Sequence, residues 1–209
     1  MHAIHKLSEF FKDFPGIGPR QAKRFVYYLL SRDEAYLNEL SRLIKEIRRT
    51  MNRCESCFKY FEIGRVPSAT CAYCSNLERD RSILTVISKD IDLEAIEKSG
   101  SYNGMYFVLG GSLPILEKDP DSKIRSRELF TGVKNSHSAE STTPIKEIII
   151  ALNLNPEGDN TADYIIGKLR PLTDEYSIKI STLGRGLSTG SEIEYADGDT
   201  IKNAFKNRF

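Results

Sequence analysis

Four cysteines are the residues of this chain whose spacing most clearly specifies a chemistry. They form two C-x-x-C pairs, Cys54 with Cys57 and Cys71 with Cys74, and the chain has no other cysteine. Each pair is typical of a tight turn that directs two sulfurs at one point, and two such turns complete a tetrahedron around one ion. Since a closed four-thiolate set leaves no position for water, the sequence predicts one structural Zn²⁺ ion and not a catalytic metal.

Three other chemistries use cysteines in similar patterns. Disulfides need an oxidising compartment, and nothing in the sequence points to export. A redox C-x-x-C is not normally present twice with no cysteine left over, and iron is an alternative occupant of four thiolates. Zinc is favoured because the spacing matches the two-turn pattern. The insert between the pairs is too short to fold alone, so metal binding is expected to supply much of its folding free energy.

A glycine-rich turn near the N-terminus separates two predicted helices. Apolar residues at helical spacing predict a first helix that ends before Pro15-Gly-Ile-Gly-Pro19. Gly16 and Gly18 permit backbone angles that are closed to other residues. Pro19 suits the first position of the next helix. The stretch therefore predicts a helix, a hairpin and a second helix.

Basic residues surround the start of that second helix. Arg20, Lys23 and Arg24 lie where unpaired amides and the helix dipole favour a phosphate. Residues 1–53 carry eleven Lys or Arg against six Asp or Glu, although the net charge of the chain is only +1. An anionic partner such as nucleic acid fits this asymmetry. We expect DNA-backbone contact here, and the alternative is an ordinary helical turn with solvated charges. The candidate DNA-binding residues are Gly16, Gly18, Arg20, Lys23 and Arg24.

The composition is ordinary for a globular protein, with 40% hydrophobic and 28% charged residues. No apolar run approaches the roughly 20 residues that cross a membrane, and the N-terminus has no apolar secretory core. We therefore expect a cytoplasmic protein with no membrane partner.

The periodicity beyond the hairpin predicts the remaining elements. A third helix, capped by Ser31, has an apolar stripe from Leu37 to Met51 that is expected to be core. Strands alternating with helices then imply a parallel sheet covered on both faces. The predicted strands span residues 83–87, 106–109, 148–152 and 177–181, the helices residues 92–98 and 161–169, and a final strand and helix residues 193–195 and 200–209.

Residues at the carboxyl ends of parallel strands decide whether such a sheet carries an active site. Ser88 follows the first predicted strand, and Asn153 and Asn155 follow the third. A magnesium site needs converging carboxylates, and these positions offer a hydroxyl and amides. Glu157 and Asp159 either bind a cation or cap the next helix, and helix-end preferences favour capping.

The order of these features resembles the RecR family of bacterial recombination mediators over essentially all 209 residues. The resemblance rests on the hairpin, the four cysteines and two further motifs, which span Phe14–Arg24, Cys54–Cys74, Tyr102–Leu109 and Ala151–Ala162. It implies a multidomain α/β protein with four parts. These are a helix-hairpin-helix domain at 1–53, a zinc finger at 54–77, a Toprim-like parallel α/β domain at 78–173 and a glycine-rich strand-helix segment at 174–209.

The resemblance also implies a function. RecR proteins are DNA-binding mediators of recombinational repair whose protomers form dimers and ring-like tetramers around DNA. They act with RecO, and often RecF, to load the RecA recombinase onto gapped single-stranded DNA. Basic residues after the hairpin contact DNA in the family and correspond to Arg20 and Arg24 here. We add Lys23 on its charge alone.

Departures from the family pattern bear on catalysis. Ser88-Lys89 stands where the family usually carries an acidic pair, and Asn153-Leu-Asn155 stands where active Toprim enzymes carry Asp-x-Asp. We therefore expect no enzyme, because amides lack the charge that holds Mg²⁺. The first alternative is a Toprim-type, metal-dependent DNA-cleaving or joining enzyme. The second is a zinc-stabilised interaction module that does not touch DNA.

Overall fold

The computed structural model describes residues 3–64, 68–139, 142–184, 186, 187, 190 and 192–206. It divides the chain into two compact units, Met1–Asn52 and Arg53–Phe209. The finer four-part division remains a prediction. None of the described helices is long and apolar enough to cross a membrane.

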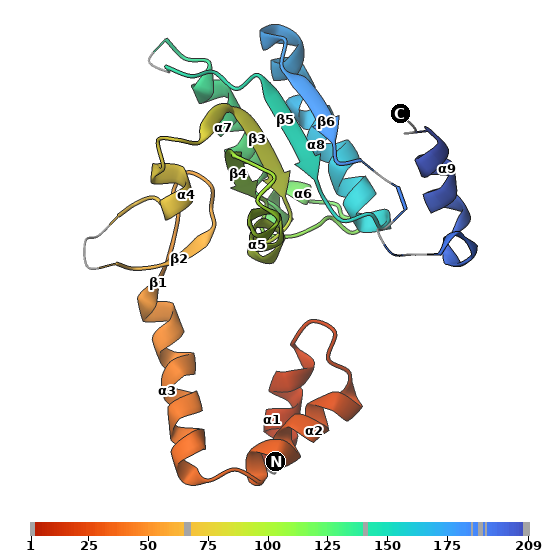
Figure 1. Ribbon diagram of the computed structural model, residues 1–209. Coiled ribbons are helices and arrows are strands. Elements are labelled where there is room, and N and C mark those ends of the chain that lie inside the picture. The colour runs from red at the N-terminus through yellow and green to blue at the C-terminus, as the bar shows by residue number, and fades with distance from the viewer. Residues whose placement is uncertain are drawn as a thin grey trace. The chain divides into compact units, whose positions relative to one another are not determined.

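The N-terminal unit is helical (Figure 1). The first two helices pack against each other through the buried side chains of Ala22 and Val26 and through an edge-to-face contact between Phe11 and Phe25. The second helix begins at Pro19, as predicted, because proline lacks the amide that a helix start leaves unpaired. The helices are α1 (Ala3–Lys12), α2 (Pro19–Leu30) and α3 (Glu34–Thr50).

Two predictions for α3 are wrong. Its N-cap is Asp33, whose carboxylate accepts a hydrogen bond from the amide of Tyr36 at 2.8 Å. Ser31 instead ends α2, where its hydroxyl donates to the carbonyl of Tyr28. The apolar stripe is also not core, since α3 has no buried residue. Periodicity reports that a helix is amphipathic, but it does not report whether anything covers its apolar face.

The second unit is built on a four-stranded parallel sheet in the order β4-β3-β5-β6 (Figure 1). Every neighbouring pair is parallel, as predicted. The strands are rich in Ile and Val, as expected for a sheet buried on both faces. They are β3 (Asp80–Ile87), β4 (Gly104–Val108), β5 (Glu147–Ala151) and β6 (Lys179–Thr182). Two shorter strands, β1 (Met51–Arg53) and β2 (Tyr60–Glu62), flank the first cysteine pair.

Alternate residues of the strands enter two separate hydrophobic cores. One core joins Leu84 and Phe107 of the sheet to α7 (Ser126–Ser136) and α8 (Pro156–Tyr176). The other joins Ile87 and Val108 to α5 (Asp90–Ser99) and to the four cysteines. The cysteine region therefore takes the place of a second covering helix over part of the sheet.

One carboxylate in α6 (Pro120–Lys123) connects helices α7 and α8 of the first core through hydrogen bonds. Asp121 accepts hydrogen bonds from Ser126, from the hydroxyl of Tyr164 at 2.8 Å and from Lys168, and Arg127 donates to its other oxygen at 2.8 Å. The Lys168 ammonium and these other donors hold the pKa of Asp121 well below its ordinary range. The ionised form of Asp121 therefore stabilises this packing.

The chain ends differently from the prediction. Residues Ile193–Tyr195 form a 3-10 turn, η1, and not a strand. The amide of Tyr195 bonds to the carbonyl of Glu192 at 3.1 Å, so this short stretch satisfies its backbone locally. Helix α9 (Gly198–Lys206) follows, and Asp197 caps it by accepting from the amide of Thr200. The last predicted helical residues, 207–209, lie outside the described part of the chain.

Candidate metal centre and nucleic-acid interface

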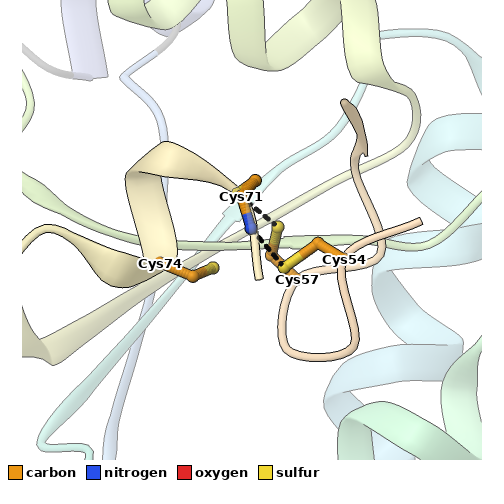
Figure 2. Close-up of side chains that lie close together, drawn as sticks. All are labelled: Cys54, Cys57, Cys71 and Cys74. Atoms are coloured by element: carbon orange, nitrogen blue, oxygen red, sulfur yellow. Dashed lines mark hydrogen bonds between the residues drawn. The ribbon is translucent and has the colours of Figure 1, made fainter. Parts of the chain in front are cut away.

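The four cysteines converge on one point (Figure 2). Cys54 and Cys57 lie in the turn after β1, Cys71 is the N-cap of α4 (Ala72–Ser75), and Cys74 lies within that helix. Their sulfurs all lie within 4.8 Å of one another, and those of Cys57 and Cys71 are 3.5 Å apart. A tetrahedron of 2.3 Å Zn–S bonds has edges of about 3.8 Å, so this donor set fits a four-thiolate metal site.

The four thiols are buried and lie within hydrogen-bonding distance of one another or of the backbone. All four are unbridged, and none is more than 6% exposed. The amide of Cys71 donates to the sulfur of Cys54 at 3.3 Å. Hydrogen bonds from Cys57, Cys71 and Cys74 hold the pKa of the Cys54 thiol far below its usual range, while the bond to Cys54 raises the pKa of Cys57. A dication would bind the four side chains as thiolates and release their protons.

The residue after the first pair has a special backbone conformation. Phe58 has φ = 64°, in the left-handed region that residues with a side chain rarely adopt. Its amide donates to the carbonyl of Cys54 at 3.0 Å, which closes the turn that aims both sulfurs inward. Strain of this kind costs on the order of 1–3 kcal/mol and persists only where the surroundings enforce it.

The surroundings of Phe58 are the edge strand of the sheet. Its ring packs on that of Phe107 at 5.2 Å, on one face of β4. Tyr73, between the second pair of cysteines, packs on Tyr106 at 6.3 Å, on the other face. At the strand edge, the amide of Val108 donates to the carbonyl of Cys57 at 2.9 Å. The two cysteine turns therefore contact β4 on both of its faces and along its edge.

An arginine covers each of these aromatic contacts. The guanidinium of Arg125 lies 5.5 Å from the Phe58 ring and donates to the carbonyl of Val108. Arg79 lies over the ring of Tyr73 and also bonds to Glu97 of α5. Sequence reasoning missed both arginines and both aromatic contacts. No spacing rule links these positions, because they meet only once the sheet has formed.

The N-terminal hairpin has the predicted turn, with one difference. Gly16 has φ = 77°, a conformation that favours glycine, whereas Gly18 has φ = −82° and an ordinary extended backbone. A side chain at either glycine would meet no atom within 4 Å. Gly18 is the N-cap of α2, and the first helical bond runs from the amide of Ala22 to its carbonyl. The preceding first-turn amides therefore have no partner within the helix.

The three predicted basic residues follow directly on this turn. Arg20, Lys23 and Arg24 are all exposed, and α2 contains no acidic residue. Within the part of the chain that the structure describes, none of the three forms an ion pair. Arg24 donates one hydrogen bond to another described residue, to the side-chain oxygen of Gln21 at 3.4 Å. Uncompensated positive charge therefore lies beside open backbone amides, as phosphate binding requires.

The carboxyl ends of β3 and β5 form the other predicted location for chemistry. These strands are neighbours whose following loops lead to opposite faces, which is where ligands bind in such sheets. Ser88 is fully buried there, and its hydroxyl lies 3.3 Å from that of Ser112. The side chain of Asn155 caps α8 by accepting from the amide of Gly158 at 2.8 Å. Both polar groups are occupied in holding the fold.

In the described part of the chain, no three carboxylates come close enough together at these strand ends to hold a metal ion. Among the described residues, the one group with three or more possible metal ligands is the set of four cysteines. Glu157 and Asp159 lie in the first turn of α8, where the dipole favours them, but the cap itself is Asn155. The cavity beside Asn153 measures about 30 Å³, which is room for about one water.

Comparison with known proteins agrees with this arrangement. A family model described as "RecR, helix-hairpin-helix" matches residues 4–48, one described as "Toprim domain" matches residues 82–183, and one described as "RecR, C-terminal" matches residues 186–208. Together they span most of the chain on both sides of the cysteines.

Curated relatives match over nearly the full length. The chain is 32% identical to the recombination protein RecR of Bifidobacterium longum subsp. infantis over 206 residues, which is 99% of this chain and 95% of that protein. It is 32% identical to the protein of the same name from Chloroflexus aurantiacus, over 98% of this chain and 93% of that protein. For the Lactococcus lactis subsp. cremoris protein the identity is 33%, over 98% and 96%.

Proposed function

Because the chain belongs to the RecR family of recombination proteins, we propose that it is a non-enzymatic mediator that binds the DNA backbone through its hairpin. The observation that carries the proposal is the start of α2. Arg20, Lys23 and Arg24 are exposed there beside Gly16 and Gly18, next to first-turn amides without a helical partner. These five residues would hold phosphate oxygens without reading bases.

We propose that the protein acts with RecO, and with RecF where it is present, to load RecA on gapped single-stranded DNA. The full-length likeness to proteins named for recombination supports this role. Of the altered Ser88-Lys89 pair at the end of β3, Ser88 is buried and Lys89 is exposed, so Lys89 is the residue that a partner would meet. A partner that relies on acidic residues at this position should bind this chain more weakly.

We propose that the metal is one structural Zn²⁺ held by the four cysteines. A closed set of thiolates with no open position supports a structural role. When bound, the ion would cross-link the two cysteine turns that contact β4. Unbridged thiols also suit a reducing compartment, so we place the protein in the cytoplasm.

We propose that protomers associate into dimers and tetramers. The apolar stripe of α3 supports this, since it exposes a row of large side chains on one helix, namely Leu37, Leu43, Ile44 and Ile47. Exposed apolar patches of this kind typically mark interfaces. Association would also place several hairpins on one DNA molecule, so that weak individual contacts add up.

The alternative, a Toprim-type DNA-cleaving or joining enzyme, has little support. A hard cation needs several carboxylate oxygens. Ser88, Asn153 and Asn155 supply none, and Ser88 and Asn155 already hold other parts of the fold. Magnesium-dependent nicking of supercoiled DNA by the purified protein would support the enzyme and overturn our choice.

The proposal is tested by DNA binding measured through fluorescence anisotropy over a salt series. Wild-type affinity should fall steeply with salt, because bound phosphates release counterions. Arg20→Glu with Arg24→Glu should abolish binding at moderate salt. For any binding that remains at low salt, the slope of log affinity against log salt concentration on single strands should be smaller in magnitude by at least about 1.4. The matched control is Lys118→Glu with Lys123→Glu, which makes the same charge change at exposed positions of the second unit.

Circular dichroism and metal content must be unchanged in both double variants. Equal loss of affinity in the two variants would mean that net charge, and not the hairpin, governs binding. Undiminished binding by a folded Arg20→Glu, Arg24→Glu protein would exclude the hairpin as the DNA site.

A further inference from the structure

One exposed aromatic ring lies in the middle of the basic face of α2. Tyr27 is 60% exposed. At 3.6 residues per turn, it lies about 20° from Arg20 around the helix axis, between the directions of Lys23 and Arg24, and about 140° from the buried Ala22. Tyr27 therefore points away from the packing between α1 and α2, toward the side where the phosphate-binding charges lie.

The other two aromatic residues of α2, Phe25 and Tyr28, have ring partners that Tyr27 lacks. Phe11 packs on Phe25, and Tyr28 packs on Tyr36 and lies 4.1 Å from the guanidinium of Arg32. Among the described residues, Tyr27 makes no ring contact and no cation contact of this kind. Its ring face is thus available to a ligand.

We propose that Tyr27 is a stacking platform for an unpaired base, so that this surface binds single-stranded DNA in preference to duplex. The inference rests on the proposed phosphate contact of the hairpin and adds a second, non-ionic contact to it. Tyr27 lies one helical turn beyond Arg24, a rise of about 4.5 Å. A strand whose phosphate is held by Arg24 can therefore lay a neighbouring base on the ring.

Physical chemistry favours a single strand as the occupant. Every base has a π-face, so stacking on tyrosine tolerates any sequence, and combining it with a basic groove is how single strands are held without sequence preference. Duplex bases are already stacked on one another and do not expose their faces to a helix on the backbone. The ring would therefore add affinity for unpaired DNA alone.

The test compares an oligothymidylate with a blunt duplex of the same length, using the full-length protein. Tyr27→Ala should lower affinity for the oligothymidylate by about 5- to 150-fold, the range measured for single base–aromatic stacks. Affinity for the duplex should stay within about twofold, and the salt slope should be unchanged, since no charge is lost. Tyr27→Phe should retain wild-type affinity, because the ring remains.

Two further variants sharpen the comparison. Tyr28→Ala removes a ring from the same helix, but one that already lies against Arg32 and Tyr36, and should change single-strand affinity by less than about twofold. Tyr27→Trp places the only tryptophan in the chain at this position. Its fluorescence should be quenched by the oligothymidylate and not by the duplex.

The outcomes separate this inference from the proposed function. Wild-type protein without salt-sensitive DNA affinity would overturn the proposed function and this inference with it. If wild type binds and Tyr27→Ala binds both DNAs equally well, the stacking inference alone is wrong. An equal loss on both DNAs, an equal effect of Tyr28→Ala, or a fall in the solution mass of Tyr27→Ala would also overturn it, the last because Tyr27 would then be a subunit contact.

Discussion

Removing the metal should destabilise the parallel sheet and not just the cysteine turns. The perturbation is Cys57→Ser, or chelation of the wild-type protein, either of which releases the two turns from each other. Phe58 has a strained, left-handed backbone conformation that persists only while the surrounding contacts hold it. Without the metal its turn should relax, and Phe58 should leave Phe107. The strand edge should also lose the hydrogen bond between Val108 and Cys57.

The size of the effect follows from these contacts. Losing a fully buried phenylalanine costs about 3–5 kcal/mol, and Phe58 is only partly buried, so about half of that applies. The Val108 hydrogen bond adds about 1 kcal/mol, and the ring pair of Tyr73 and Tyr106 adds about 0.5–1.5 kcal/mol. A total of about 3–5 kcal/mol corresponds to a fall in Tm of about 6–20 °C for a protein of this size.

The assay pairs differential scanning calorimetry with hydrogen exchange at the Val108 amide, on protein whose metal content is measured by mass spectrometry. Ser56→Ala is the matched control, since it changes an exposed residue of the same turn that is not a ligand. It should keep the metal and the wild-type Tm. A metal-free protein with an unchanged Tm and an unchanged Val108 exchange rate would refute the reasoning, because the turns would then not support the strand.

Four further predictions concern the rest of the molecule. Gly158→Ala should cost about 1–3 kcal/mol in urea unfolding followed by circular dichroism, because its Cβ would lie 1.9 Å from the carbonyl oxygen of Asn153. Gly132→Ala, where nothing lies within 4 Å, should instead stabilise helix α7 by about 0.5–1 kcal/mol. The pKa of Asp121 is lower in the folded protein than its unfolded value of about 4, so ionised Asp121 stabilises the fold above that pH. This stabilisation is lost as the pH falls through the lower folded pKa. Asp121→Asn should therefore be less stable than the wild type at neutral pH, and its free energy of unfolding should change less as the pH is lowered. Ile44→Lys with Ile47→Lys should lower the mass seen by light scattering while leaving the helical signal intact, and an unchanged mass would exclude the α3 stripe as an interface.

The elements that sequence reasoning located best are those whose signal is local. Short, mostly apolar runs predicted the strands of the sheet, and the cysteine spacing predicted a convergence that the structure contains. Pro19 predicted the start of α2 because proline restricts its own backbone. Each of these signals depends on residues close together in the chain.

What sequence reasoning missed depends on contacts between distant residues. The stripe of α3 has the pattern of a core helix, but whether a partner covers it is not encoded in the period. The contact of Phe58 with Phe107 and the cluster around Asp121 join residues more than forty positions apart. Residues Ile193–Tyr195 were predicted to form a strand but form a 3-10 turn, because three residues do not form a stable strand without a neighbouring strand.

The most direct test of the central claim is site-specific photo-cross-linking of the full-length protein to DNA. A benzophenone amino acid would replace Lys23 at the start of α2 in one protein and Lys118 in another, both exposed positions. Our account predicts a covalent protein–DNA adduct from position 23 that disappears at high salt and in the Arg20→Glu, Arg24→Glu background, with little adduct from position 118. An adduct from position 118 with none from position 23, in protein that binds DNA, would contradict it.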